Sequence, residues 1–359
     1  MKEQIKQLAS YVPEEPLAAV KKRYGLKKLV RLSANENPFG TSSKVKKAIV
    51  NWNFSETNRY PDGNATLLRN AVAKKLQVDP KKIVFGDGLD EIIELISRVF
   101  LKPGDEVLQT SPTFSEYGLH AAIEGAQVVK VPCDPQTGKH DFKGLLAKIE
   151  SKTKLIWICN PNNPTGAYAT PTELAEFAAQ IPQNILLLID EAYIHYATDE
   201  KKPSALPLLK RFSNVVVMRT FSKVYGLANY RVGFAVMDQK LADYLQAVRL
   251  PYNLNSLSQV GALAALKDQQ FVAVSIKKTA KERQKWENFF EQHQIKYFHS
   301  QANFIFFKYP QALELADYLL KKGFQLRRGL AEDWLRLTIG KKEDGEKLRA
   351  LIDCYQGNK

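Results

Sequence analysis

Four short polar segments, each at or just beyond the end of an apolar run, could together build a site that handles a carbonyl compound. They are NPNNPTG at 160–166, DEAY at 190–193, RTFSK at 219–223 and RVG at 231–233. The third ends in Lys223, whose amine can attack an aldehyde once it is partly deprotonated. Desolvation and neighbouring cations lower the pKa of a lysine, and both fit a lysine that follows a buried strand near Arg231. We therefore expect a nucleophilic lysine here, rather than another of the many surface lysines.

Asp190 and Arg231 indicate what the aldehyde is. Asp190 ends the apolar run at 185–189, where a carboxylate is costly unless it is paired. A protonated pyridine nitrogen would pair with it; a solvent-facing aspartate at a strand end is the alternative. Arg231 offers two charge-assisted donors to a phosphate, unless a nearby carboxylate pairs with it instead. With Lys223 and Ser222, these groups predict a site for pyridoxal 5'-phosphate.

Two turns supply further candidate cofactor contacts. The GDGLDE segment at 86–91 joins an expected strand to an expected helix, and N–H groups at a helix start can hold a phosphate. The candidates for this phosphate are Gly88, Leu89, Asp90, Thr220, Ser222 and Arg231. In the turn at 160–166, two prolines and a glycine fix the loop, so that the amide of Asn163 can donate to the phenolic oxygen of the cofactor. A purely structural turn asparagine is the alternative.

In this order the segments resemble the fold-type I aminotransferases. Other segments resemble the histidinol-phosphate aminotransferase family among them, so that the resemblance runs from end to end. They are LASYVP at 8–13, LSANENP at 32–38, RYP at 59–61 and LRLTIG at 335–340. The resemblance implies a transfer of an amino group between L-histidinol phosphate and 2-oxoglutarate, in histidine biosynthesis.

The resemblance also implies roles for single residues. Tyr193 is expected to bond the phenolic oxygen of the cofactor and Phe114 to stack on its ring, although plain packing is the alternative for both. Tyr60 is expected to reach the phosphate in the partner subunit of a homodimer, with an ordinary turn tyrosine as the alternative. The residues expected at the anionic end of the substrate are Tyr11, Asn35, Arg327 and Arg336. The two arginines could instead be surface charges, above all Arg327.

Departures from the family pattern leave the substrate open. Leu89 stands where a small serine or alanine is usual, and residues 229–230 are Asn-Tyr instead of Gly-Leu. An aromatic amino-acid aminotransferase and a threonine-phosphate decarboxylase therefore remain alternatives. A regulator that joins such a domain to a DNA-binding module is not favoured, because the motifs already begin by Asn35.

The strand and helix pattern predicts an α/β fold with a mostly parallel sheet flanked by helices. Continuous apolar runs at 154–159, 185–189 and 215–218 are typical of parallel strands covered on both faces. Further strands are expected at 82–85 and 106–109, and helices at 90–100 and 113–124. Ligands in such sheets bind beyond the carboxyl ends of the strands, which is where the four polar segments lie.

Three regions are expected along the chain. Residues 1–34 would form an arm that associates with the small domain and the dimer partner, and residues 35–252 the large cofactor-binding domain. Residues 253–359 would form a smaller α+β domain. Its expected helices lie at 271–293 and 311–321, and its expected strands at 304–307 and 335–338.

The composition of the chain indicates which kinds of binding partner to expect. The 359 residues carry 52 Lys and Arg against 38 Asp and Glu, a net charge of +14. The lysine pairs are scattered and no nucleic-acid-binding motif accompanies them, so we expect neither a nucleic-acid nor a membrane partner. The charged N-terminus and short apolar runs predict a cytoplasmic protein. Three separated cysteines and five histidines show no metal-ligand spacing, so no metal site or disulfide is expected.

Overall fold

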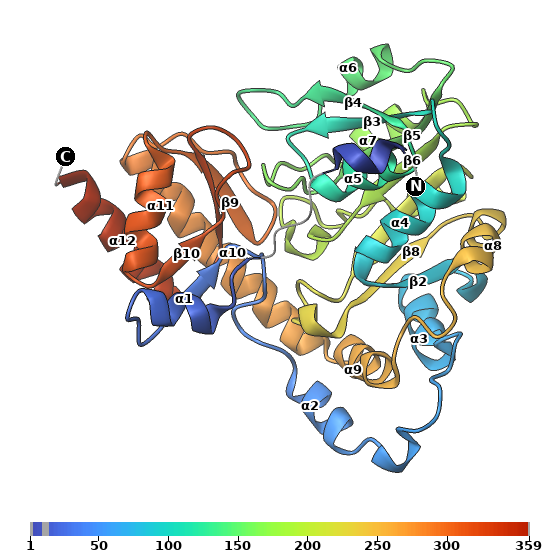
Figure 1. Ribbon diagram of the computed structural model, residues 1–359, viewed down its shortest axis with the longest axis horizontal. Coiled ribbons are helices and arrows are strands. Elements are labelled where there is room, and N and C mark those ends of the chain that lie inside the picture. The colour runs from blue at the N-terminus through green and yellow to red at the C-terminus, as the bar shows by residue number, and fades with distance from the viewer. Residues whose placement is uncertain (1–2, 9–13, 358–359) are drawn as a thin grey trace.

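A seven-stranded sheet forms the centre of the larger of two units in the computed structural model, which describes residues 3–8 and 14–357 (Figure 1). In spatial order the strands are β2 (Ile83–Asp87), β8 (Val232–Val236), β7 (Val215–Thr220), β6 (Leu186–Asp190), β5 (Thr153–Cys159), β3 (Glu106–Ser111) and β4 (Gln127–Pro132). Only β8 runs antiparallel to its neighbours, and the other adjacent pairs are parallel. The predicted α/β fold with a mostly parallel sheet is confirmed.

Helices cover both faces of this sheet. The helices of the larger unit are α2 (Ser43–Val50), α3 (Thr66–Leu76), α4 (Gly88–Phe100), α5 (Ser115–Ile123), α6 (Phe142–Ala147), α7 (Pro171–Ala178), α8 (Gln239–Val248) and α9 (Ser256–Leu266). Along β5, Leu155 and Trp157 pack in the core with α4, α5 and α8. Ile156 and Ile158 pack on the other face with α6 and α7. Alternate residues enter opposite cores, which explains why this strand is apolar throughout.

The smaller unit combines strand pairs and long helices. Its strands are β1 (Val30–Leu32), β9 (Phe304–Lys308), β10 (Phe324–Leu326) and β11 (Trp334–Thr338), and its helices are α1 (Leu17–Arg23), α10 (Gln269–Gln292), α11 (Ala312–Lys321) and α12 (Lys342–Gly357). β11 pairs antiparallel with β9, and β1 pairs parallel with β10. The N-terminal segment from α1 to β1 therefore lies with the C-terminal part of the chain, as Figure 1 shows.

Two helices that follow residue 252, the expected boundary, pack at least in part with the larger unit. α9 packs against α2 and α3, and its Ala262 and Ala265 belong to the core that also contains Phe85 of β2. α10 then joins the two units, because Val272 near its start lies in that same core and Phe290 near its end lies in the core of the smaller unit. The division of the chain into domains stays a prediction, and this packing leads us to propose the boundary within α10 instead of at residue 252.

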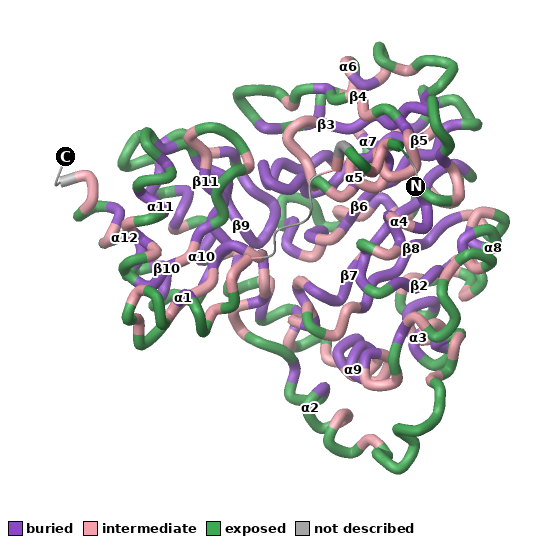
Figure 2. Tube along the Cα trace, in the orientation of Figure 1, coloured by how far each residue is buried: buried purple, intermediate pink, exposed green. Residues whose placement is uncertain are grey.

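The structure moves several expected ends by one to a few residues. Sheet pairing extends three strands so that Asp87, Asp190 and Thr220 become their last residues. The helix expected from residue 113 begins at Ser115, with Phe114 extended just before it at φ −66° and ψ 130°. Burial follows the layers, with the sheet interior buried and the loop between α2 and α3 exposed (Figure 2). No helix in residues 3–8 and 14–357 is long and apolar enough to cross a membrane.

Candidate active site

A cavity of about 280 Å³ lies at the carboxyl ends of β5, β6 and β7, next to the start of α4. The predicted residues that line it are Leu89, Asp90, Phe114, Asn163, Asp190, Tyr193, Thr220, Ser222, Lys223 and Arg231. Segments that are up to 142 positions apart in sequence meet here because parallel strands end at one edge of the sheet. Ala34, Glu36, Tyr117 and Cys159 also line the cavity and were not predicted.

Lys223 lies three residues beyond β7, at the cavity wall. Its Nζ donates to the carbonyl oxygen of Ala34 at 3.4 Å and lies 5.6 Å from the centre of the Tyr193 ring. Desolvation, followed by the charges of Arg336 and Arg231, lowers the pKa of Lys223 to about 8. At this pKa about a tenth of such amines are neutral at pH 7, which is compatible with the expected nucleophile; the role of Lys223 stays a prediction.

Asp190 lies buried at the end of β6. Its Oδ2 accepts a hydrogen bond from the Tyr117 hydroxyl at 2.7 Å, and its Oδ1 accepts one from the Ala192 N–H at 2.9 Å. Burial raises the pKa of Asp190 to about 6, although both donors oppose the shift. The carboxylate is not the solvent-facing one of the alternative interpretation, and a cationic group in the cavity would stabilise its charge.

Tyr117 is a residue of the cavity wall that the sequence interpretation missed, and it binds Asp190 directly. It lies on α5, fully buried, and stacks on Trp157 with ring centres 4.5 Å apart. Stacking on Trp157 holds the Tyr117 ring in place, and the hydrogen bond from its hydroxyl in turn orients the Asp190 carboxylate. A signal was present, since Tyr117 falls three residues after Phe114 on the expected helix and so shares its face.

The start of α4 and Arg231 form a cradle. Gly88 is the first residue of the helix, with φ +72°. A Cβ atom there would lie 2.2 Å from Nη2 of Arg231, so any residue other than glycine would clash with the guanidinium. Arg231 donates to Asp90 at 2.9 Å, the carboxylate pairing that the alternative foresaw. Both side chains are about half exposed, so the pair is worth at most about 1 kcal/mol. The N–H of Gly88 donates to the carbonyl oxygen of Arg231 at 3.0 Å. The N–H groups that follow it have no partner within the helix itself, as is general for the first turn. The hydroxyls of Thr220 and Ser222, 2.9 Å apart, line the same cavity as Leu89 and Asp90.

A second polar network lines the side toward the smaller unit. Asn35 donates to the Tyr193 hydroxyl at 3.1 Å and accepts a bond from Thr338 at 3.0 Å. The side-chain oxygen of Asn163 accepts a bond from Arg336. With that oxygen engaged, the amide presents Nδ2 as a donor, the atom that a phenolic oxygen requires.

Arg336 is the buried cation of this network. Its Nη2 donates to the carbonyl oxygen of Ser33 at 2.6 Å, and its guanidinium lies 5.3 Å from the centre of the Phe304 ring. Its Nε has no hydrogen-bond partner in the part of the chain that the structure describes. A buried unpaired donor is costly, which suits a group that binds an anion.

Five predicted residues in the described part of the chain are not lining residues of this cavity. Gly88, Asn35 and Arg336 contact side chains that line it, whereas Tyr60 and Arg327 have other neighbours. Tyr60 lies in the loop between α2 and α3, 83% exposed, and stacks on Tyr252 with ring centres 4.7 Å apart. Arg327 is half exposed and pairs with Glu14 at 3.6 Å. Tyr11 lies outside the described residues. The role of Tyr60 concerns a partner subunit and stays a prediction.

The mostly parallel sheet and the polar residues at the carboxyl ends of its strands are shared with a known family of proteins. Residues 27–352 match the family described as aminotransferase class I and II. The chain therefore belongs to the class I and II aminotransferases, with the predicted fold-type I architecture.

Particular relatives share nearly the whole chain. It is 56% identical to a histidinol-phosphate aminotransferase of Limosilactobacillus fermentum, over 98% of both chains. It is 52% identical to one of Lactiplantibacillus plantarum, over 98% of this chain and 99% of that one. Among solved structures, a histidinol-phosphate aminotransferase of Sinorhizobium meliloti in complex with pyridoxal 5'-phosphate is similar with a TM-score of 0.87, at 28% identity over 98% of this chain and 95% of that one.

Proposed function

We propose that this chain is a pyridoxal-phosphate-dependent aminotransferase of histidine biosynthesis that exchanges an amino group between L-histidinol phosphate and 2-oxoglutarate in the cytoplasm. The observation that carries the proposal is that Lys223, Asp190, Tyr193, Asn163 and Arg231 line one cavity or its rim. Relatives named for this activity, at 56% and 52% identity over nearly the whole chain, support the choice of substrate.

The cavity fits the cofactor in three respects. The space at Gly88 that a Cβ would fill lies against the Arg231 guanidinium, as a phosphate cradle requires. The buried carboxylate of Asp190, with its raised pKa, suits a proton-bearing ring nitrogen. The lowered pKa of Lys223 suits an amine that binds an aldehyde. When bound, pyridoxal phosphate supplies that aldehyde and a ring that withdraws electrons from the substrate Cα.

The residues of the chain would then act as follows. Lys223 would hold the cofactor and afterwards move the proton of the substrate Cα, because its amine is partly neutral and reaches the cavity. Asp190 would keep a proton on the ring nitrogen. Tyr193 and Asn163 would donate to the phenolic oxygen, and Phe114 would pack on the ring. The phosphate would be held by Gly88, Leu89, Asp90, Thr220, Ser222 and Arg231.

The anionic end of the substrate would meet the arginines of the smaller unit. Among the residues that the structure describes, none pairs with the Nε of Arg336. Arg336 also lies beside Asn163, and Arg327 lies opposite it in an isolated bridge. Two guanidinium groups suit a phosphate that carries about two charges. Asn35 and Tyr11 complete the proposed set.

Parallel assays with 2-oxoglutarate test the function. We expect kcat/KM for L-histidinol phosphate to exceed that for phenylalanine or tyrosine by about 10- to 100-fold, because one or two charge-assisted hydrogen bonds are lost without the phosphate. A preference for phenylalanine or tyrosine would instead support the aromatic alternative. Release of carbon dioxide from threonine phosphate would support the decarboxylase.

We further propose a homodimer in which Tyr60 completes the phosphate site of the partner subunit. Its exposure and its stacking on Tyr252 support this role. Mixing Tyr60→Phe with Lys223→Ala should yield, after subunit exchange, more activity than either parent, because one site of a mixed dimer carries both defects and the other carries neither. A fully active monomer, or proven exchange without recovery, would contradict the proposal; Tyr244→Phe, another partly exposed tyrosine, is the control for cofactor retention.

A further inference from the structure

Arg327, the residue directly after β10, lies opposite Arg336 of β11. The N–H of each donates to the carbonyl oxygen of the other, at 3.1 and 2.9 Å. Residues directly opposite in an antiparallel pair project from the same face. The charge of Arg327 contributes, after burial, to the lowered pKa of Arg336. The two arginines are therefore close enough to act on one anion.

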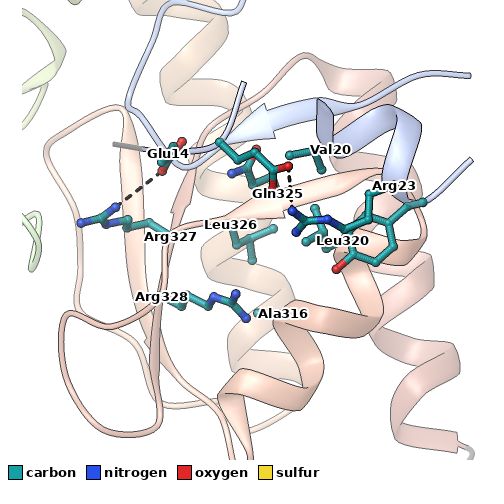
Figure 3. A pocket seen from close by; sticks show the side chains of 11 residues that line it. Glu14, Val20, Arg23, Ala316, Leu320, Gln325, Leu326, Arg327 and Arg328 are labelled. Atoms are coloured by element: carbon teal, nitrogen blue, oxygen red, sulfur yellow. Dashed lines mark hydrogen bonds and ion pairs between the residues drawn. The ribbon is translucent and has the colours of Figure 1, made fainter. Parts of the chain in front are cut away.

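Glu14, just before α1, brings a carboxylate to Arg327, one member of this arginine pair (Figure 3). Its Oε1 lies 3.6 Å from Nη1 of Arg327, and its Oε2 accepts a bond from the Ser33 hydroxyl at 2.9 Å. Ser33 in turn accepts, through its carbonyl oxygen, the bond from Arg336. The negative charge of Glu14 partly offsets the lowering of the Arg336 pKa. One carboxylate thus offsets part of the positive charge of the two arginines, at the place proposed for the substrate anion.

Glu14 and Arg327 line a second cavity, in which other charged side chains have partners of their own. The cavity, of about 230 Å³, is lined by Glu14, Glu15, Arg23, Arg327 and Arg328 among others. Arg23 pairs with Glu15 at 2.7 Å, and Arg328 pairs with Asp317 at 2.6 Å. Glu14 is therefore the carboxylate that faces Arg327, and Glu15 provides a matched residue next to it in sequence.

The ion pair between Glu14 and Arg327 is weak enough for a bound anion to replace it. Their side chains are 26% and 44% exposed, and such pairs contribute little stability because water screens them. A phosphate that bound Arg327 would also repel the carboxylate at this distance. Binding of an anion at Arg327 and the contact of Glu14 with Arg327 thus oppose each other.

We propose that Glu14 is an internal counter-ion of the Arg327–Arg336 pair, which the anionic end of the amino donor displaces. This inference rests on the proposed function, because it assigns the anion of that substrate to the arginine pair. Glu14 lowers the affinity for every anion, and a donor with two charges on its phosphate offsets this competition better than a donor with one. Glu14 therefore selects for highly charged donors.

Calorimetric titration of the holoenzyme with inorganic phosphate at low ionic strength tests the proposal. The bound cofactor fills its own phosphate site, so the titration reports on the arginine pair. Glu14→Gln should lower the Kd for phosphate by about three- to fivefold, the equivalent of one exposed ion pair. Glutamine keeps the size of the side chain and an acceptor for Ser33. Glu15→Gln should leave the Kd unchanged, because the partner of Glu15 is Arg23.

A double variant locates the effect. In an Arg327→Gln background, Glu14→Gln should no longer tighten phosphate binding. The proposal is overturned if Glu14→Gln binds phosphate no better than the parent or not at all, if Glu15→Gln gains as much, or if the gain survives without Arg327. These titrations need no turnover. A failed assay with histidinol phosphate beside the expected titrations would therefore overturn the proposed function alone.

Discussion

Replacing Lys223 by alanine should lower the transamination rate by about four orders of magnitude or more, since the variant loses both the amine that holds the cofactor and the base that moves the Cα proton. The fold should persist, because the Lys223 side chain donates one long hydrogen bond within the described residues, to Ala34 at 3.4 Å. Single-turnover absorbance measurements and circular dichroism would check both expectations.

Chemical trapping tests independently of reaction rates whether Lys223 is the residue that holds the cofactor. Borohydride reduction of the native holoenzyme, followed by peptide mapping, should place the pyridoxyl group on Lys223. Lys75 is the matched control, because desolvation and Arg219 lower its pKa too but it lies outside the cavity. Label on another lysine, or a normal rate in Lys223→Ala, would contradict the assignment, whereas Lys75→Ala should remain active.

Asp190→Asn should lower the rate of Cα proton removal by about two to three orders of magnitude, as is typical when a group that stabilises developing charge is removed. Asparagine keeps the size of the side chain and one acceptor oxygen for Tyr117 or Ala192. What it loses is the negative charge that would keep the ring nitrogen protonated. Stopped-flow measurement of a half-reaction would isolate this step.

Tyr117→Phe is the control that separates charge from position. It removes the 2.7 Å hydrogen bond to Asp190 and keeps the ring stacked on Trp157. A hydrogen bond to a charged group contributes about 1.5–3 kcal/mol, so the rate should fall by about 10- to 100-fold, less than in Asp190→Asn. Near-normal single-turnover rates in Asp190→Asn would show that Asp190 is not the partner of the ring nitrogen.

The sequence by itself determined the fold class and the centre of the candidate site. Buried parallel strands are apolar on both faces, so the apolar runs before Asp190 and Lys223 could be recognised as strands from the sequence. Such strands end at one edge, where ligands bind, so the polar residues after each run could be expected to meet. Local chemistry also marked the turn around Asn163 and the helix start at Gly88, because proline, glycine and helix ends act over a few residues.

Only the tertiary structure decided which distant side chains meet. Tyr117 and Asp190 are 73 positions apart, and no local pattern requires their hydrogen bond. Arg231 and Asp90, 141 positions apart, form an ion pair that the sequence could offer only as an alternative. α9 follows the expected boundary and yet packs in the core of the larger unit. Glu14 reaches Arg327 because β1 pairs with β10 and carries the N-terminal segment across. These contacts depend on the packing of whole elements, which periodicity along the chain does not encode.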